Sequence, residues 1–193
     1  MQFERAKEVI LEKLNKELPK HLSYHSVSHV TDVYTAAEYI GMLEQINKND
    51  MKLLLTAALF HDAGFMHGPN SHEEESCRIA NHYLPGFNYA IDEIEKINGM
   101  IMATKLPQMP KTALEEIICD ADLDYLGRDD FFPISNNLYA EFSYAGIVNN
   151  ENDWNKIQVA FFEKHHYFTN SAVRLRQKKK EENLSLIKAK IKA

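Results

Sequence analysis

Four stretches of the chain place residues that bind metals or carry protons where an apolar pattern would otherwise continue. In each stretch, imidazole or carboxylate groups stand beside residues typical of a protein core. Burying one such group without a partner costs several kcal/mol, whereas several buried together can share a cation. The stretches are YHSVSH with His25 and His29, LFHDAGF with His61 and Asp62, HEEES with His72 and Glu73, and CDADLD with Asp120, Asp122 and Asp124.

The His61–Asp62 doublet is the least expected of these groups. It directly follows MKLLLTAALF, a run whose composition is typical of a buried helix. Taken alone, the doublet could be an ordinary helix end, with a histidine beside a capping aspartate. Because three further polar stretches accompany it, the sequence favours a metal-binding role.

Neutral imidazoles and ionised carboxylates are suitable ligands for a divalent metal ion. Two histidines and two aspartates would leave open positions on the ion for water and for a substrate oxygen. The ion would lower the pKa of that water and offset the charge of a phosphate. The mixed nitrogen and oxygen set suits Mn, Fe, Co, Ni, Mg or Zn, so the identity of the metal stays open.

The elements that must position these groups are all expected to be helices. Apolar residues recur at helical spacing, and no long alternation of apolar and polar residues predicts a strand. Proposed caps are Asn49 for the third helix, Ser71 for the fourth and Thr112, with Glu115 in a capping box. The predicted helices cover about 3–18, 26–43, 49–64, 71–84, 89–104, 112–127, 129–146, 151–166 and 170–191.

The length and composition of the chain are typical of a single domain with one hydrophobic core. The 193 residues are too few for two comfortable domains, and 45% of them are hydrophobic. We therefore expect a single domain over residues 1–193. Cys77 and Cys119 are far apart and read as buried thiols in a reducing compartment.

The same composition bears on partners and location. The formal net charge of −6 gives no general reason to expect binding to a nucleic acid polymer. The charged, amphipathic N-terminus lacks a signal-peptide core, and no window approaches a membrane span. We expect a cytoplasmic protein, and the amphipathic terminal helix allows a homodimer. The basic run RLRQKKK at 174–180 is typical of a solvated face.

The motifs together resemble the HD superfamily of metal-dependent phosphohydrolases. That family places a His, a His–Asp doublet and a distant Asp on an all-α helical bundle. YHSVSH, ALFHDAGF and ICDADLDYLG are similar to these motifs, and the resemblance extends over roughly residues 20–180. It implies metal ligands at His29, His61, Asp62 and Asp122, with Asp120 as the alternative to Asp122. The neighbouring Asp124 is expected to be a solvated or capping residue.

The resemblance also implies catalytic and substrate-binding roles, and one departure. In some HD nucleotidases a Glu that serves the attacking water lies one turn after the doublet histidine, where this chain has Phe65. Glu73 is the candidate to replace it, with His72 or Glu74 as alternatives, although acidic residues in a first helical turn also stabilise a helix without catalysis. His25 occupies the position that protonates the leaving group in related phosphodiesterases, and Asp62 is counted among the catalytic residues.

His67 and His72 are the predicted contacts to substrate phosphate. The expected function is therefore a metal-dependent phosphohydrolase that uses metal-activated water on a small phosphorylated metabolite, with nucleotides as the leading class. The alternative is a metal- and nucleotide-binding signalling module without turnover, favoured by the absence of the Glu at position 65. A third interpretation, a paired-iron oxygenase, would need additional histidine ligands.

Overall fold

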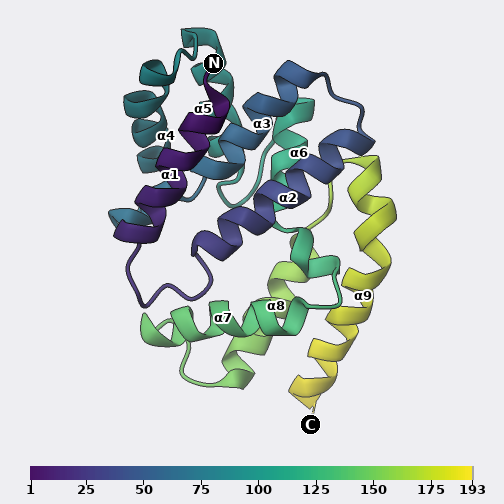
Figure 1. Cartoon of the computed structure of the whole chain (residues 1–193). Coiled ribbons are helices and arrows are strands. Elements are labelled where there is room, and N and C mark those ends of the chain that lie inside the picture. Colours follow the sequence, from purple (N-terminus) through teal and green to yellow (C-terminus); the bar gives the residue numbers. More distant parts are fainter. Residues whose placement is uncertain (193) are drawn as a thin grey trace.

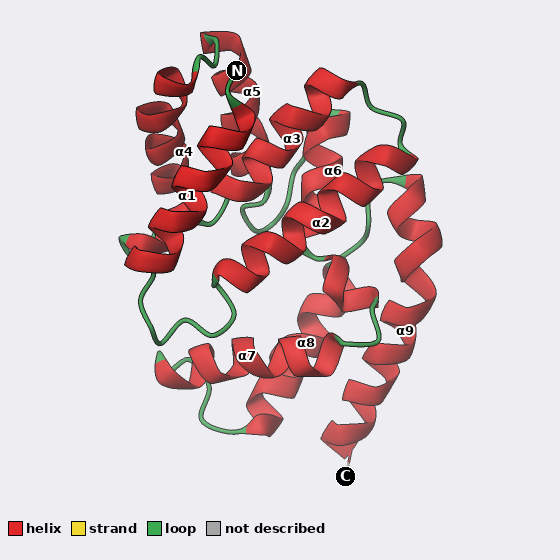
Figure 2. Ribbon diagram, viewed as in Figure 1, coloured by secondary structure: helices red, strands yellow, loops and turns green. Residues whose placement is uncertain are grey.

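The computed structural model describes residues 1–192, and within that range every regular element is a helix (Figures 1 and 2). This confirms the predicted all-α class. Short 3-10 turns cover Ala63–Met66, Leu84–Phe87 and Asp124–Gly127. The α-helices are α1 (Phe3–Glu17), α2 (Val27–Leu43), α3 (Lys48–Phe60), α4 (His72–Tyr83), α5 (Ile91–Ala103), α6 (Ala113–Asp122), α7 (Phe131–Tyr144), α8 (Glu151–Lys164) and α9 (Asn170–Lys192).

The main core surrounds α3, which crosses the upper part of the view in Figure 1. Every residue from Leu53 to Phe60 is buried, so this helix is covered on all sides rather than along one stripe. Helices α1, α2, α5 and α6 pack against it and contribute side chains such as Ile10, Ile40 and Ile101. The end of α3 therefore lies in the interior, where a polar residue needs a partner.

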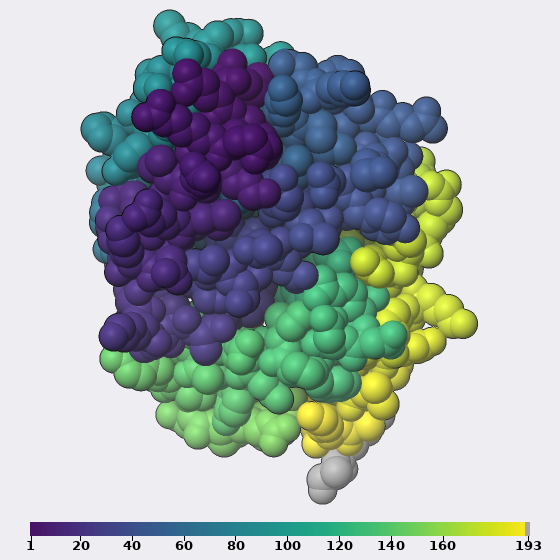
Figure 3. Space-filling view, in the orientation of Figure 1, coloured from purple at the N-terminus to yellow at the C-terminus, as the bar shows by residue number. Residues whose placement is uncertain are grey.

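A second, smaller core lies where α7, α8 and α9 meet the end of the CDADLDYLG motif. Its buried members are Tyr24, Leu123, Tyr125, Leu126, Phe131, Phe162 and Ile187. In Figure 1, α7 and α8 form the lower end of the molecule and α9 runs down one side toward the C-terminus. In the space-filling view, the green surface of the α7–α8 region sits directly beneath the segment that leads into α2 (Figure 3).

An ion pair and a hydrogen bond of buried residues hold α9 in place. Asp124 is buried, and one of its carboxylate oxygens lies 2.6 Å from Nε of Arg176, while the other lies 3.5 Å from Arg128. Lys180 is also buried and donates to the main-chain oxygen of His165. Two expectations were therefore wrong: Asp124 is not solvated, and the basic run at 174–180 is solvated only in part. Packing of α9 against the turn at 124–127 buries Asp124, and the segment before α9 covers Lys180 through His165 and Tyr167.

Several predicted helix ends also differ from the structure. Asn47, not Asn49, caps α3, because its side-chain oxygen accepts from the N–H groups of Asn49 and Asp50. Thr112 caps α6 as expected, but Glu115 accepts from Lys111 N–H rather than completing the box on Thr112. Ser71 precedes α4 with a positive φ of 53° and its side chain makes no capping hydrogen bond.

Both cysteines are free thiols, Cys119 being buried and Cys77 partly buried. Among the described residues, no helix is both long enough and apolar enough to cross a membrane.

Candidate metal centre

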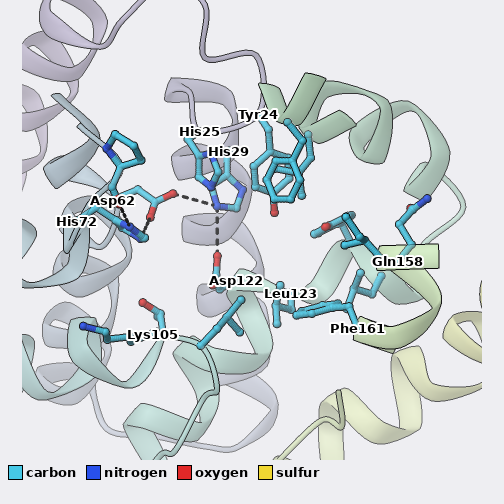
Figure 4. Close-up of a pocket in the computed structure, with 18 of the residues that line it drawn as sticks. Tyr24, His25, His29, Asp62, His72, Lys105, Asp122, Leu123, Gln158 and Phe161 are labelled. Carbon is cyan, nitrogen blue, oxygen red and sulfur yellow. Dashed lines mark hydrogen bonds and ion pairs between the residues drawn. The ribbon is translucent and has the colours of Figure 1, made fainter. Parts of the chain in front are cut away.

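Four side chains from three parts of the main core converge at one point. His29 lies in the first turn of α2, His61 and Asp62 directly follow the last residue of α3, and Asp122 is the last residue of α6. Figure 4 shows His29 between the two carboxylates, pointing toward both. Helices α2, α3 and α6 pack against one another through apolar side chains. This packing brings together the helix ends that carry the four side chains.

The distances among these groups are those of a set that can share an ion. One ligand atom each from His29, His61 and Asp122 lies within 4.8 Å of the other two. The Nε2 atoms of the two imidazoles are 3.4 Å apart. Asp122 Oδ1 lies 3.2 Å from His29 Nε2, and Asp62 Oδ2 lies 3.3 Å from His61 Nε2.

The local environment fits a divalent cation. Asp62 Oδ2 is buried and makes no hydrogen bond with any described residue, which leaves a carboxylate oxygen in need of a partner. His61 Nδ1 lies 2.8 Å from the carbonyl oxygen of Ala58, to which it can donate, so Nε2 is the atom that faces the cluster. The residues present therefore match the nitrogen and oxygen donor set expected for a metal.

Without a metal, the cluster holds its charge as a buried ion network. Burial alone would lower the pKa of His61, but Asp62 and Asp122 outweigh it and hold that pKa well above its ordinary value. In the opposite direction, burial alone would raise the pKa of Asp122, but its contacts with His29 and His61 bring that pKa down to about 2. In the metal-free protein, a proton on His61 would therefore occupy the position that a metal ion would take.

A short loop after the doublet is fixed by α4. The Ser76 hydroxyl donates to the carbonyl oxygen of His61 and accepts from the N–H of Gly64. A Cβ atom at position 64 would come within 2.0 Å of the His72 carbonyl oxygen, so only glycine permits this approach. The contact sets the direction in which His61 and Asp62 leave α3.

Asp120 faces away from the cluster. Its carboxylate accepts from the N–H groups of Phe168 and Thr169 and from the Thr169 hydroxyl, at 2.7–2.8 Å. It therefore anchors the segment before α9. This placement supports Asp122, and not the alternative Asp120, as the candidate ligand from this motif.

His25 lies beside the cluster but outside α2, which begins at Val27. This agrees with the predicted helix start near residue 26, so His25 belongs to the segment that enters α2. Glu141 of α7 holds His25, accepting from its main-chain N–H at 2.9 Å and lying 2.6 Å from its Nδ1. Glu141 is buried and was missed in the sequence. Only the fold brings residues 25 and 141 together.

The remaining candidates lie at different distances from the cluster. His72 Nε2 is 3.5 Å from Asp62 Oδ1 and 3.4 Å from Oε1 of the buried Glu73. Phe65 lies between two imidazoles, 4.0 Å from the ring of His25 and 4.2 Å from that of His72.

Two residues of the sequence-based set do not line the site. His67 is largely exposed and pairs with Glu75, and the alternative Glu74 pairs with Lys105 at the surface. His67 is therefore not supported as a phosphate contact, since its imidazole is engaged outside the site.

A cavity of about 410 Å³ opens beside the cluster (Figure 4). His25, His29, Asp62, His72, Glu73 and Asp122 line one end of it, and Lys105 stands at that end as well. Leu123, Gln158 and Phe161 lie toward the other end, where apolar side chains predominate. This volume is within the range of about 300–1,000 Å³ that is usual for small-molecule sites.

Three solved structures resemble the chain in fold. A predicted HD superfamily hydrolase from an uncultured Thermotogales bacterium has a TM-score of 0.61 at 21% identity, covering 97% of this chain and 88% of its own. Bacillus subtilis YpgQ, in complex with ADP, has a TM-score of 0.67 at 18% identity, covering 100% and 96%. Lin1889 of Listeria innocua has a TM-score of 0.63 at 17% identity, covering 98% and 95%.

No curated protein matches the sequence. The model of the HD domain family matches residues 24–124, a range that contains both imidazoles and both carboxylates of the cluster. It covers more than half of the chain and agrees with the sequence motifs and the helical frame. The chain belongs to the HD domain family.

Proposed function

We propose that the protein is a metal-dependent phosphohydrolase that acts on a small phosphorylated metabolite. The observation that carries this proposal is the His29–His61–Asp122 cluster at one end of an open cavity, with the buried Asp62 oxygen beside it that makes no hydrogen bond with any described residue. Membership of the HD domain family supports it. A bound divalent ion would supply Lewis acidity toward water and toward the phosphate.

The residues of the chain supply the proton transfers. A water oxygen forms a new bond to phosphorus, and its proton passes to the buried carboxylate of Glu73, which lines the cavity. The ester P–O bond breaks, and the leaving oxygen takes a proton from Nε2 of His25. Glu141 binds the other ring nitrogen and, against the effect of burial, raises the pKa of His25. The imidazole is thereby held in one orientation and stays charged to a higher pH than an isolated histidine.

Charge at the mouth of the cavity would assist substrate binding. Lys105 lines the cavity near His72 and pairs with the surface residue Glu74. An incoming phosphate can take over this ammonium group as an ion-pair partner. His72 lies in the same region and is the second proposed contact to the phosphate.

Nucleotides are the first substrates to assay. YpgQ, which has the same fold, was crystallised with ADP, and the sequence motifs resemble those of nucleotide-cleaving HD proteins. The physiological metal would be identified in the same assays, since Mn, Fe, Co, Ni, Mg and Zn all suit this donor set.

One observation favours a second function, a metal- and nucleotide-binding signalling module without turnover. Phe65 fills the space between His25 and His72, in the place where related nucleotidases carry a Glu. A site built in this way can bind an ion and a phosphate without activating water at that position.

The deciding experiment joins metal analysis to a phosphate-release screen. The purified protein and an Asp62→Ala variant are compared for bound metal and for phosphate released from nucleotides with added Mn, Mg, Co or Ni. Metal in the wild type, loss of it in the variant and phosphate release support the hydrolase. Metal and nucleotide binding without release would support the signalling module, and absence of metal binding would overturn both.

Location and assembly stay proposals of the same kind. We place the protein in the cytoplasm, and the amphipathic terminal helix allows a homodimer, which light scattering over a range of concentrations would detect.

A further inference from the structure

The cavity beside the metal cluster has two chemically different ends. The charged residues that line it are Asp62, Glu73, Lys105 and Asp122, and among the described residues all of them come from the first 122 positions. The opposite end, here called the apolar lobe, is lined by Leu138, Phe142, Trp154, Ile157, Phe161 and Phe162. These residues belong to α7 and α8, which lie outside the part of the chain that matches the HD domain.

The apolar lobe is firmly built from packed aromatic rings. Phe142 meets Trp154 edge to face with ring centroids 5.4 Å apart, and Phe162 meets Phe131 in the same way at 5.2 Å. Its base is formed by the second core, so the walls are held by buried side chains. An apolar surface that faces a cavity gains free energy when an apolar group displaces water from it.

Apart from the Tyr24 and Tyr125 hydroxyls and the Trp154 indole, the polar group that lines the cavity away from the metal end is the amide of Gln158, which is already hydrogen-bonded within the protein. Gln158 accepts from the Ser135 hydroxyl at 2.6 Å and donates to Asn155 at 3.1 Å, and all three residues are buried. A nucleoside placed here would bury ribose hydroxyls and base-edge groups against hydrocarbon. Polar groups that lose water without gaining a partner weaken binding.

We infer that the apolar lobe binds a hydrocarbon group attached to the phosphate, so that the substrate class is a phosphate monoester of an apolar alcohol. This inference rests on the proposed phosphohydrolase function and narrows its substrate. The phosphate lies at the metal end near Lys105, and the hydrocarbon extends between α7 and α8. Hydrolysis then releases inorganic phosphate and the apolar alcohol, which takes its proton from His25.

Trp154 offers a direct probe of the lobe, since it is the single tryptophan of the chain and lines this end of the cavity. Ethyl-, butyl- and hexylphosphonate, which cannot be hydrolysed as esters, are titrated into the full-length protein with Mn²⁺ while tryptophan emission is recorded. Each added methylene should tighten binding about fourfold, the value expected for burying a CH₂ group. Adenosine monophosphate should bind more weakly than hexylphosphonate.

Two variants test whether this gain comes from the lobe. Ile157 is 38% exposed and Leu138 is partly buried, so glutamine at either position can be accommodated by the fold. Ile157→Gln and Leu138→Gln should flatten the dependence on chain length and leave the binding of inorganic phosphate unchanged. Leu186→Gln, on the exposed face of α9, is the matched control and should retain the full dependence.

The outcomes separate this inference from the proposed function. A steep chain-length dependence that the lobe variants abolish, with hexyl phosphate hydrolysed at a higher kcat/KM than adenosine monophosphate, supports both. Equal binding of all three phosphonates, with phosphate released from nucleotides, overturns the apolar lobe as a substrate site and leaves the phosphohydrolase intact. A steep dependence without phosphate release from any ester supports the lobe and overturns the phosphohydrolase.

Discussion

Asp120 and Asp122 are two residues apart in one short helix, but their carboxylates have different partners and different roles. Asp122 faces two imidazoles at the end of α6, whereas Asp120 binds the chain before α9 through three hydrogen bonds. Burial raises the pKa of Asp120 to about 6, even though these hydrogen bonds oppose the shift. One carboxylate is therefore available to a metal ion and the other is committed to structure.

The first prediction separates these roles by matched substitutions. Asp122→Asn should abolish metal binding, because a neutral amide is a much weaker ligand at the same position. Asp120→Asn should retain the metal but lower the free energy of unfolding by about 1–3 kcal/mol, since an NH₂ group would then face N–H donors. Metal content and urea unfolding of both variants check this. Equal metal loss in both would contradict the assignment.

A second prediction follows from the proton on His61. Asp62 and Asp122, against the effect of burial, hold the pKa of His61 well above its ordinary value, so the metal-free imidazole keeps its proton to a higher pH than a free histidine does. A metal must displace that proton, and its apparent Kd should fall by up to about tenfold per pH unit. Calorimetric titration in buffers of different ionisation enthalpy measures both effects. A Kd that does not change between pH 6 and pH 8 would contradict it.

The residues of the cluster could be picked out from the sequence because each stands in a short motif with its own apolar context, and the resemblance to the HD superfamily grouped them. The residues that hold them in place could not. Glu141 carries no local signal, since its contacts with Tyr24 and His25 join positions more than a hundred residues apart. The apolar lobe was missed for a related reason. Its side chains have the spacing of ordinary core residues on α7 and α8, and only the fold turns them toward the cavity.

At the scale of elements, the contact between Glu141 and His25 links α7 to the segment that enters α2. Burial raises the pKa of Glu141, but the bond to His25 outweighs it, and the net pKa lies below 4.5. The pKa of His25 lies above 6.5. Both groups are therefore charged between these two values, and the contact is strongest there.

The third prediction concerns the pH range between the lowered pKa of Glu141 and the raised pKa of His25. The stability contributed by His25 is present below pH 6.5 and is lost as pH rises through its raised pKa, while that of Glu141 is lost as pH falls through its lowered pKa. Glu141→Gln should cost about 1.5–3 kcal/mol near pH 6 and less near pH 9. Urea unfolding at both pH values measures the difference. Glu163→Gln, an exposed ion-pair residue of α8, is the control and should cost under about 1 kcal/mol at either pH.

The predicted helices were mostly right in kind and shifted at their ends. Apolar periodicity identifies α3 because its residues face a core on all sides, but the cap depends on which asparagine reaches the free N–H groups. Asp124 was misread because its partner Arg176 lies 52 residues away on α9. Tertiary contacts of this kind leave no trace in a local pattern.

At the scale of the whole molecule, the ion and the fold must stabilise each other. The cluster draws its ligands from α2, the end of α3 and α6, so a bound ion joins three parts of the main core. An ion that binds only the folded chain adds stability according to its concentration relative to Kd.

The fourth prediction is that added metal raises the free energy of unfolding by about 2.7 kcal/mol at a hundred times its Kd. The midpoint of thermal unfolding should rise with metal concentration in the wild type. Asp122→Asn should show no such rise, because it lacks the site. A metal-induced rise of equal size in that variant would show that the ion binds elsewhere.

The position of the cluster at two helix ends has a further consequence. Both α3 and α6 direct their C-terminal ends at it, and each such end carries roughly half a negative charge from its aligned peptide dipoles. The N-terminal end of α2 at His29 and a proton on His61 offset part of this charge, but with the carboxylates of Asp62 and Asp122 the metal-free cluster remains attractive to cations and repulsive to anions. Binding should therefore be ordered: the metal enters first, and the phosphate follows only after the sign of the local field has been reversed.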